Sequence, residues 1–142
     1  SIGLDSSRGK IWIHKSASSE RFEVVFTADH DSFLESMADA DKSVMDFVGR
    51  SRIVYINVAN RLSVDCDCDA HPHDPEMGDI GIFASTDPVS LDQACVDAVY
   101  NSLDTGKAAL IERMESRHGI HTVEAAHALG LGSRDYDLVK IG

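Results

Sequence analysis

Two cysteines and two histidines stand close together in a strongly acidic segment of the chain, at Cys66, Cys68, His71 and His73. Six carboxylates lie between Asp65 and Asp79, and neither Lys nor Arg occurs there. Negative neighbours disfavour the thiolate form of cysteine unless a cation offsets their field. A divalent metal ion does so, because it binds thiolates, neutral imidazoles and carboxylates together. The segment therefore predicts a metal site.

The spacing of these side chains permits shared binding of one ion if the backbone bends. In an extended chain, residues two apart point to the same side, so Cys66 and Cys68 can bind one ion together. His71 and His73 share a side in the same way. Because the cysteines have even numbers and the histidines odd numbers, a bend between the two pairs is required.

The predicted ligands of an iron or zinc ion are two thiolates, one or both imidazoles and flanking carboxylates: Cys66, Cys68, His71, His73, Asp65 and Asp79. Cys95 is expected to be an inert core thiol, unless the fold brings it beside the other two cysteines. Two alternatives stay open. The segment could be an acidic surface loop with two incidental thiols, or Cys66 and Cys68 could form a disulfide in a tight, strained ring.

Outside this segment, the spacing of the histidines does not by itself predict a site. Glu124 and His127 have the i, i+3 spacing found in di-iron helical bundles, but two copies are needed there and only one is present. A surface pair on a short helix is the favoured interpretation. The remaining histidines have no partners at informative spacing: His14, His30, His118 and His121.

The elements that must position the acidic segment begin with strand patterns. Residues 10–14 and 22–27 are rich in β-forming side chains and predict an N-terminal β-hairpin. A helix is expected after an N-cap at Asp31 or Ser32 and is expected to end at Gly49. Its apolar residues recur at helical spacing, at Phe33, Met37, Ala40, Val44 and Phe47.

The middle of the chain predicts two strands with a long loop between them. Residues 53–58 form a nearly continuous apolar run, which is typical of a central strand covered on both faces, and residues 79–84 resemble it. Residues 60–78 show no periodicity, and loops this long are usually functional or disordered. Asp87 and Pro88 then predict a helix start. The buried stripe of that helix is expected at Leu91, Ala94, Cys95, Ala98 and Val99.

The last third predicts helices over residues 107–117 and 122–130 and a closing strand over 136–141. The glycine-rich residues 130–133 follow a helix instead of opening one, so they are interpreted as a helix stop and not as a phosphate loop. Together these patterns predict a single mixed α/β domain over residues 1–142. In it, helices pack on a central, mostly buried sheet of about five strands.

Composition excludes some classes of partner. The chain has 142 residues, of which 43% are hydrophobic and 26% are charged, and its net charge is −11. Such a surface repels phosphate backbones and anionic lipids, so we expect neither nucleic acid nor a membrane as partner. Three cysteines do not make a disulfide framework, which favours a reducing, cytoplasmic setting. The start at Ser1 without a signal pattern indicates an excised or processed fragment.

Several motifs in order resemble a known family. They are Asn57, Asp65-Cys66-Asp67-Cys68, residues 79–94 and residues 129–138. This pattern resembles the C-terminal part of the domain-of-unknown-function family 362, whose members are often labelled iron–sulfur cluster-binding proteins. The resemblance spans residues 53–141, and the segment before residue 31 resembles nothing that we can name.

The resemblance implies a longer parent protein with an N-terminal α/β portion and a ferredoxin-like insert. This chain has no Cys-x-x-Cys-x-x-Cys run, so an iron–sulfur cluster is expected only in the intact protein. The chain is then a C-terminal fragment whose partner is the missing N-terminal, ferredoxin-like portion. His71 and His73 lie outside the family pattern.

Two functions from different classes follow. The first is a metal-binding, redox-associated domain of an iron–sulfur-type protein, which meets a redox partner and uses the acidic Cys/His loop as its site. The second is a non-catalytic scaffold domain whose acidic loop docks the rest of the protein or a basic partner. Docking of that kind should weaken steeply as ionic strength rises and should not change when a chelator is added.

Overall fold

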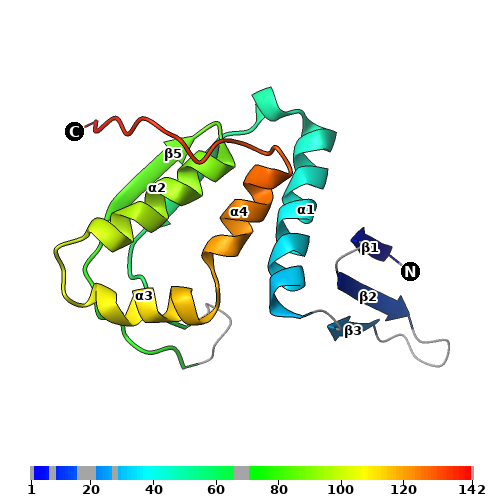
Figure 1. The fold of residues 1–142 in the computed structure, drawn as a ribbon, viewed down its shortest axis with the longest axis horizontal. Coiled ribbons are helices and arrows are strands. Elements are labelled where there is room, and N and C mark those ends of the chain that lie inside the picture. Colours follow the sequence, from blue (N-terminus) through cyan, green and yellow to red (C-terminus); the bar gives the residue numbers. More distant parts are fainter. Residues whose placement is uncertain (1, 7–8, 16–21, 27–28, 66–70, 142) are drawn as a thin grey trace.

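The computed structural model describes residues 2–6, 9–15, 22–26, 29–65 and 71–141. These residues form a mixed α/β fold, as the sequence predicts (Figure 1). In chain order the elements are β1 (Ile2–Ser6), β2 (Gly9–Lys15), β3 (Phe22–Phe26), α1 (His30–Val48), the 3-10 turn η1 (Arg50–Arg52), β4 (Tyr55–Ala59), β5 (Gly81–Ser85), α2 (Pro88–Asn101), α3 (Lys107–Ser116) and α4 (Ile120–Ala128).

The strands form two separate antiparallel sheets, so the prediction of one central sheet of about five strands is wrong. β1, β2 and β3 pair in chain order, with Ile11 opposite Phe26, which confirms the N-terminal hairpin and adds a third strand. β4 and β5 pair with each other, with Asn57 opposite Phe83. Residues 136–141 form no strand, because alternation alone does not supply a neighbouring strand, and their apolar side chains lie exposed.

Among the described residues, the β4–β5 sheet is covered on one face only, which corrects the prediction of strands buried on both faces. Helix α2 packs on this sheet (Figure 1). Along β4 and β5 the exposed positions alternate with partly buried ones. The open face of the sheet is aliphatic, with Ile56, Val58 and Ile82 each at least 60% exposed, and Val54, which directly precedes β4, is exposed as well. A nearly continuous apolar run therefore does not establish that both faces are covered.

Helix α1 starts earlier than predicted, and its buried face is shifted along the sequence. Asp29 is the N-cap, and its carboxylate accepts a hydrogen bond from the backbone N–H of Ser32 (3.0 Å). Gly49, with φ of 90°, ends the helix as expected. The buried apolar residues are Leu34, Ala38 and Met45, whereas the predicted stripe contains Met37, Val44 and Phe47, which are all at least half exposed.

Asp87 joins the start of α2 to the C-terminal segment. One carboxylate oxygen accepts from the backbone N–H of Ser90 (2.9 Å), which confirms the predicted N-cap. The other oxygen accepts from the backbone N–H of Ser133 (2.9 Å). Gly132 allows this approach, because a Cβ there would lie 1.9 Å from the Asp87 carboxylate. Gly130 has φ of 71° and follows the end of α4, so the predicted helix stop is confirmed.

The core lies where α1, α2 and α4 meet. Met45, Val89, Val123 and Leu131 form its buried cluster. α1 and α4 lie side by side, and the segment after α4 crosses the end of α2 (Figure 1). Within the described ranges, no helix combines the length and the apolar composition that a membrane span needs.

Candidate functional site

The acidic segment folds back on itself at Asp65 and His73. Oδ2 of Asp65 accepts a hydrogen bond from the backbone N–H of His73 (2.9 Å) and lies 2.6 Å from Nδ1 of the same residue. Ser63 donates from its hydroxyl to the backbone carbonyl of His73 (3.0 Å). These contacts close a short loop of chain, and both cysteines of the predicted site belong to the sequence between its ends.

Asp79 lies at the base of the longer loop. Its carboxylate accepts one hydrogen bond from the side-chain amide of Asn60 (3.0 Å) and another from the backbone N–H of Arg61 (2.8 Å). Arg61 has φ of 49°, in the left-handed region, and this contact holds that turn. Asp79 therefore joins the two ends of the loop, and its role as a metal ligand stays a prediction.

The other predicted ligands fall into two groups. Cys66 and Cys68 lie outside the described residues, and His71 is exposed. Of the six residues predicted as ligands, the structure brings Asp65 and His73 into contact. The proposed ligation by the whole set stays a prediction.

The acidic loop is held against the turn between α2 and α3. One carboxylate oxygen of Asp104 accepts from the backbone N–H of Gly78 (2.8 Å), and the other accepts from that of Gly106 (2.9 Å). A Cβ at Gly106 would lie 1.9 Å from the backbone carbonyl oxygen of Glu76. The end of the loop thus packs directly on the backbone of this turn.

These contacts change the acidity of two carboxyl groups. Hydrogen bonds from the backbone and the ring of His73 lower the pKa of Asp65 below 3.8, and the charges of His73 and Arg113 act in the same direction. Backbone hydrogen bonds from Gly78 and Gly106 lower the pKa of Asp104 below 3.8. In both cases the ionised form is the one that the fold prefers.

We expect the attachment of the loop to weaken in acid. The unfolded chain takes up these protons at about 3.8, above the pKa in the folded state, so the stabilisation is present above 3.8 and is lost as the pH falls through the folded pKa. Carboxyl-carbon NMR titration of the wild-type protein should give midpoints below 3.8 for both residues. Asp65→Asn with Asp104→Asn should make stability less dependent on pH in this range. A midpoint at or above 3.8 for either carboxyl would contradict this account.

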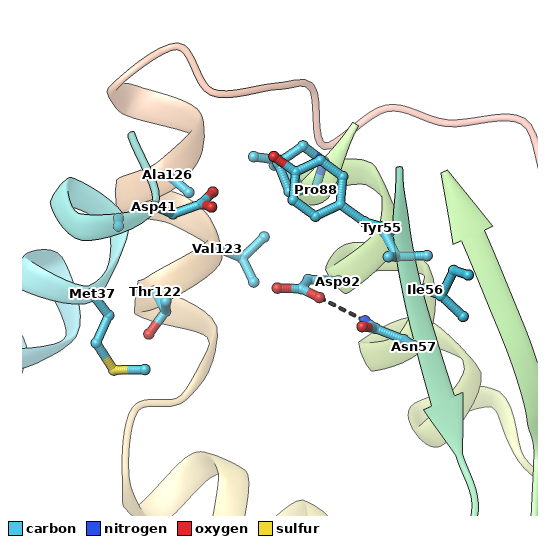
Figure 2. Close-up of a pocket in the computed structure, with 13 residues that line it drawn as sticks. Met37, Asp41, Tyr55, Ile56, Asn57, Pro88, Asp92, Thr122, Val123 and Ala126 are labelled. Carbon is cyan, nitrogen blue, oxygen red and sulfur yellow. Dashed lines mark hydrogen bonds between the residues drawn. The ribbon is translucent and has the colours of Figure 1, made fainter. Parts of the chain in front are cut away.

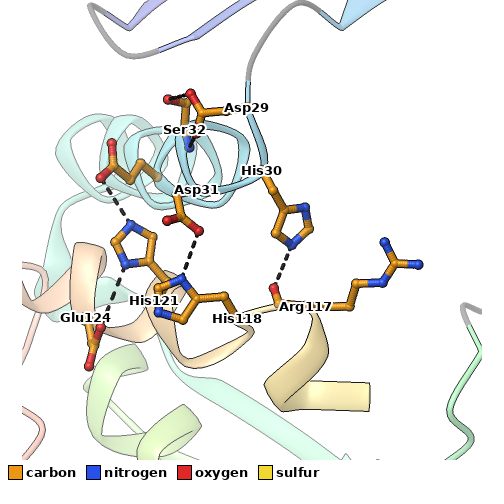
Figure 3. Close-up of polar contacts among 9 residues, drawn as sticks. Asp29, His30, Asp31, Ser32, Arg117, His118, His121 and Glu124 are labelled. Atoms are coloured by element: carbon orange, nitrogen blue, oxygen red, sulfur yellow. Dashed lines mark hydrogen bonds and ion pairs between the residues drawn. The ribbon is translucent and has the colours of Figure 1, made fainter. Parts of the chain in front are cut away.

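A second group of possible metal ligands lies at the start of α4 (Figure 3). One donor atom each from His118, His121 and Glu124 lies within 4.8 Å of the other two. The two imidazole rings are stacked, with their centroids 4.9 Å apart and their planes at 19°. The three side chains therefore form a compact donor set of two nitrogens and one carboxylate.

The turn between α3 and α4 produces this arrangement. His118 adopts φ of 49°, a left-handed conformation that histidine tolerates better than most non-glycine residues. Gly119 donates its backbone N–H to the carbonyl of Met114 (2.8 Å), which ends α3 tightly. The backbone N–H of His121 then donates to the carbonyl of His118 (2.9 Å). The two imidazoles are therefore held next to each other by the backbone itself.

Carboxylates of α1 face both histidines. Nδ1 of His118 lies 2.9 Å from a carboxylate oxygen of Asp31, and Nε2 of His121 lies 3.1 Å from one of Glu35. Asp31 and Glu35 are four residues apart and so share one face of α1. These contacts attach the start of α4 to the start of α1.

Glu124 completes the donor set from within α4. Its Oε2 lies 3.7 Å from Nδ1 of His121, and its Oε1 lies 3.1 Å from Nη1 of Arg134. The side chains are 51% exposed at His118, 22% at His121 and 42% at Glu124. Two imidazoles and one carboxylate with open positions are the ligands of many catalytic zinc and non-haem iron sites. The geometry can therefore hold one such ion and leave it accessible from solvent.

Sequence reasoning missed this cluster. The spacing His-x-x-His-x-x-Glu, from His118 to Glu124, was present in the sequence and places successive donors near one another around a helix start. His127 contacts the carbonyl oxygen of Gly132 (2.9 Å).

Cys95 lies beside Asn57 and is not fully buried. Its Sγ is 3.5 Å from Nδ2 of Asn57, and the residue is partly buried. Burial raises the pKa of the Cys95 thiol, the charge of Asp92 raises it further, and the hydrogen bond from Asn57 opposes both. The thiol form is therefore favoured at neutral pH. Because Cys95 is only partly buried, the predicted core position is wrong, and its lack of reactivity stays a prediction.

Comparison with known proteins identifies the family. The sequence model of the family described as domain of unknown function DUF362 matches residues 1–97. This match includes the first 30 residues, which the sequence resemblance left unassigned, whereas residues 129–138 lie beyond it. Comparison with curated proteins and with solved structures gave no match. Because the match covers more than half of the chain, the protein belongs to the DUF362 family.

Proposed function

We propose that this domain binds a divalent metal ion, iron or zinc, and that the intact protein uses the site in redox chemistry. The observation that carries the proposal is the convergence of donor atoms from His118, His121 and Glu124 within 4.8 Å. Zinc at such a site supplies a Lewis acid, and iron supplies redox chemistry. Asp31 and Glu35 of α1 orient the two imidazoles, as carboxylates commonly do around metal-binding histidines.

The acidic Cys/His loop is proposed as a second donor set. Asp65 contacts Nδ1 of His73, which is the carboxylate–histidine arrangement that fixes a ring so that Nε2 binds a metal. Cys66 follows Asp65 directly in the chain, and Cys68 is five residues from His73, so both thiols are close in sequence to that ring and are proposed as the further ligands. Asp65 then orients a ligand instead of binding the ion itself.

Titration of the whole protein with Co²⁺, a spectroscopic substitute for zinc and iron, tests the proposal. Binding at the His/Glu set should give weak visible absorption without sulfur-to-metal charge transfer. Binding at the loop should add charge-transfer absorption that is lost in Cys66→Ser/Cys68→Ser. Both signals should disappear with EDTA. Absence of any Co²⁺-dependent spectrum, together with no heat of Zn²⁺ binding, would overturn the proposal.

Peptide binding tests the scaffold function, in which the acidic loop docks a basic partner or the rest of the protein. Asp65 lies 3.6 Å from the guanidinium of Arg113 in the same chain, which supports this alternative. If docking is the role, a basic peptide should bind to the wild-type protein with strong salt dependence and without any effect of EDTA. Binding of Co²⁺ without such peptide binding favours the metal function.

A further inference from the structure

An open cavity of about 300 Å³ lies between α1 and α4 on one side and β4 and α2 on the other (Figure 2). Its volume is at the lower end of the range for small-molecule sites, roughly 300–1,000 Å³. Much of the lining is apolar and includes Met37, Ala38, Leu91, Val123 and Ala126. It is separate from the two donor sets described above, because none of their residues lines it.

Three oxygen-bearing side chains from three elements line this cavity (Figure 2). Asp41 comes from α1, and its carboxylate has no hydrogen bond or ion pair with any described residue. Asp92 comes from α2 and accepts a hydrogen bond from Nδ2 of Asn57 (2.7 Å). Tyr55 comes from β4, and its hydroxyl is buried without a hydrogen-bond partner in the part of the chain that the structure describes.

The charges around the cavity are negative. Burial raises the pKa of Asp41, and the charge of Asp92 raises it further. Burial also raises the pKa of Tyr55, and Asp41 adds to that effect. No Lys, Arg or His is among the lining residues. The charge of Arg50 lowers the pKa of Tyr55, but its guanidinium donates a hydrogen bond to the backbone carbonyl of Gly130 (2.7 Å).

We propose that this cavity binds a small organic cation, a primary ammonium group with a short apolar tail. An ammonium group has three N–H donors, and the carboxylates of Asp41 and Asp92 supply acceptors from two different elements. The apolar lining covers the tail. The apolar lining favours an organic cation over a hydrated metal ion such as Mg²⁺, which keeps several of its waters and gains nothing from apolar contacts.

The proposal is tested with n-butylammonium and with 1-butanol, its neutral counterpart, by methyl NMR on the whole protein. n-Butylammonium should cause saturable shifts at Val89, Val123 and Ala126, which line the cavity. Its affinity should exceed that of 1-butanol about tenfold or more, because hydrogen bonds to charged groups are the stronger ones. Equal affinity for the two compounds, or no saturable shift with either, would overturn the proposal.

Variants assign the binding to the cavity. Asp41→Asn and Asp92→Asn should each reduce the affinity for n-butylammonium about tenfold. Asp39→Asn removes the same charge from α1 but lies outside the lining, so its affinity should stay at the wild-type value. An equal loss in all three variants would show only general charge attraction. Displacement of n-butylammonium by a lower concentration of Mg²⁺ would also contradict the proposal.

Discussion

Replacing both His118 and His121 with Ala is expected to lower the affinity for Zn²⁺ at α4 by more than about 100-fold. Loss of an orienting partner around a metal site costs roughly 10–100-fold, and this change removes two of the three ligands themselves. Glu124 alone would remain, already 3.1 Å from Arg134. Competition with a chromophoric chelator measures the change, and it should be done on Cys66→Ser/Cys68→Ser protein so that the loop does not contribute.

His127→Ala is the matched control for this prediction. His127 lies on the same helix but contacts the carbonyl of Gly132, so Zn²⁺ affinity should remain at the starting value. The double variant also removes the contacts to Asp31 and Glu35, and its folding must be checked by circular dichroism. Glu124→Gln gives an independent test, because it keeps the side-chain shape and removes the charged ligand. Unchanged affinity in folded double-variant protein would exclude this donor set.

Two helix ends with strong local signals could be predicted, whereas the start of α1 was placed two or three residues too late. Asp87 followed by Pro88 predicts the start of α2, and Gly49 predicts the end of α1. The buried face of α1 was harder to predict from the sequence than the ends of the helices. Leu34, Ala38 and Met45 are buried because α4 and the core lie on that side, which the sequence of the helix alone does not specify.

The sheet was overestimated for a related physical reason. Apolar and alternating runs report that a strand can form, but not how many neighbours it has or what covers its faces. Ile56 and Val58 are residues typical of a buried strand, yet they lie on the open face of a two-stranded sheet. Residues 136–141 alternate as a strand would, yet no ladder forms there.

The candidate sites show the same division between local and long-range information. Asp65 and His73 are eight residues apart, so their contact is encoded within one segment whose chemistry the sequence already indicates. The pairs of His118 with Asp31 and His121 with Glu35 join positions 87 and 86 residues apart. Only the packing of α4 against α1 brings those groups together.

Gly106→Ala is expected to lower the free energy of unfolding by about 3 kcal/mol, at the upper end of the usual cost of overpacking. The added Cβ would lie 1.9 Å from the carbonyl oxygen of Glu76 and 2.5 Å from its carbonyl carbon, so backbone would have to move. The φ of −63° at Gly106 suits alanine, and the effect is therefore purely steric. Urea unfolding followed by circular dichroism measures it.

Gly78→Ala provides the comparison within the same contact. A Cβ there would lie 3.4 Å from a carboxylate oxygen of Asp104, an ordinary contact, so stability should remain close to wild type. Equal stability of the two variants would contradict the tight packing of the loop on the α2–α3 turn. Because Glu76 belongs to the acidic loop, Gly106→Ala should also weaken Co²⁺ binding by the loop thiols. The His/Glu set on α4, fixed by its own turn and by α1, should bind Co²⁺ as before, which makes this one substitution a means of separating the two proposed metal sites.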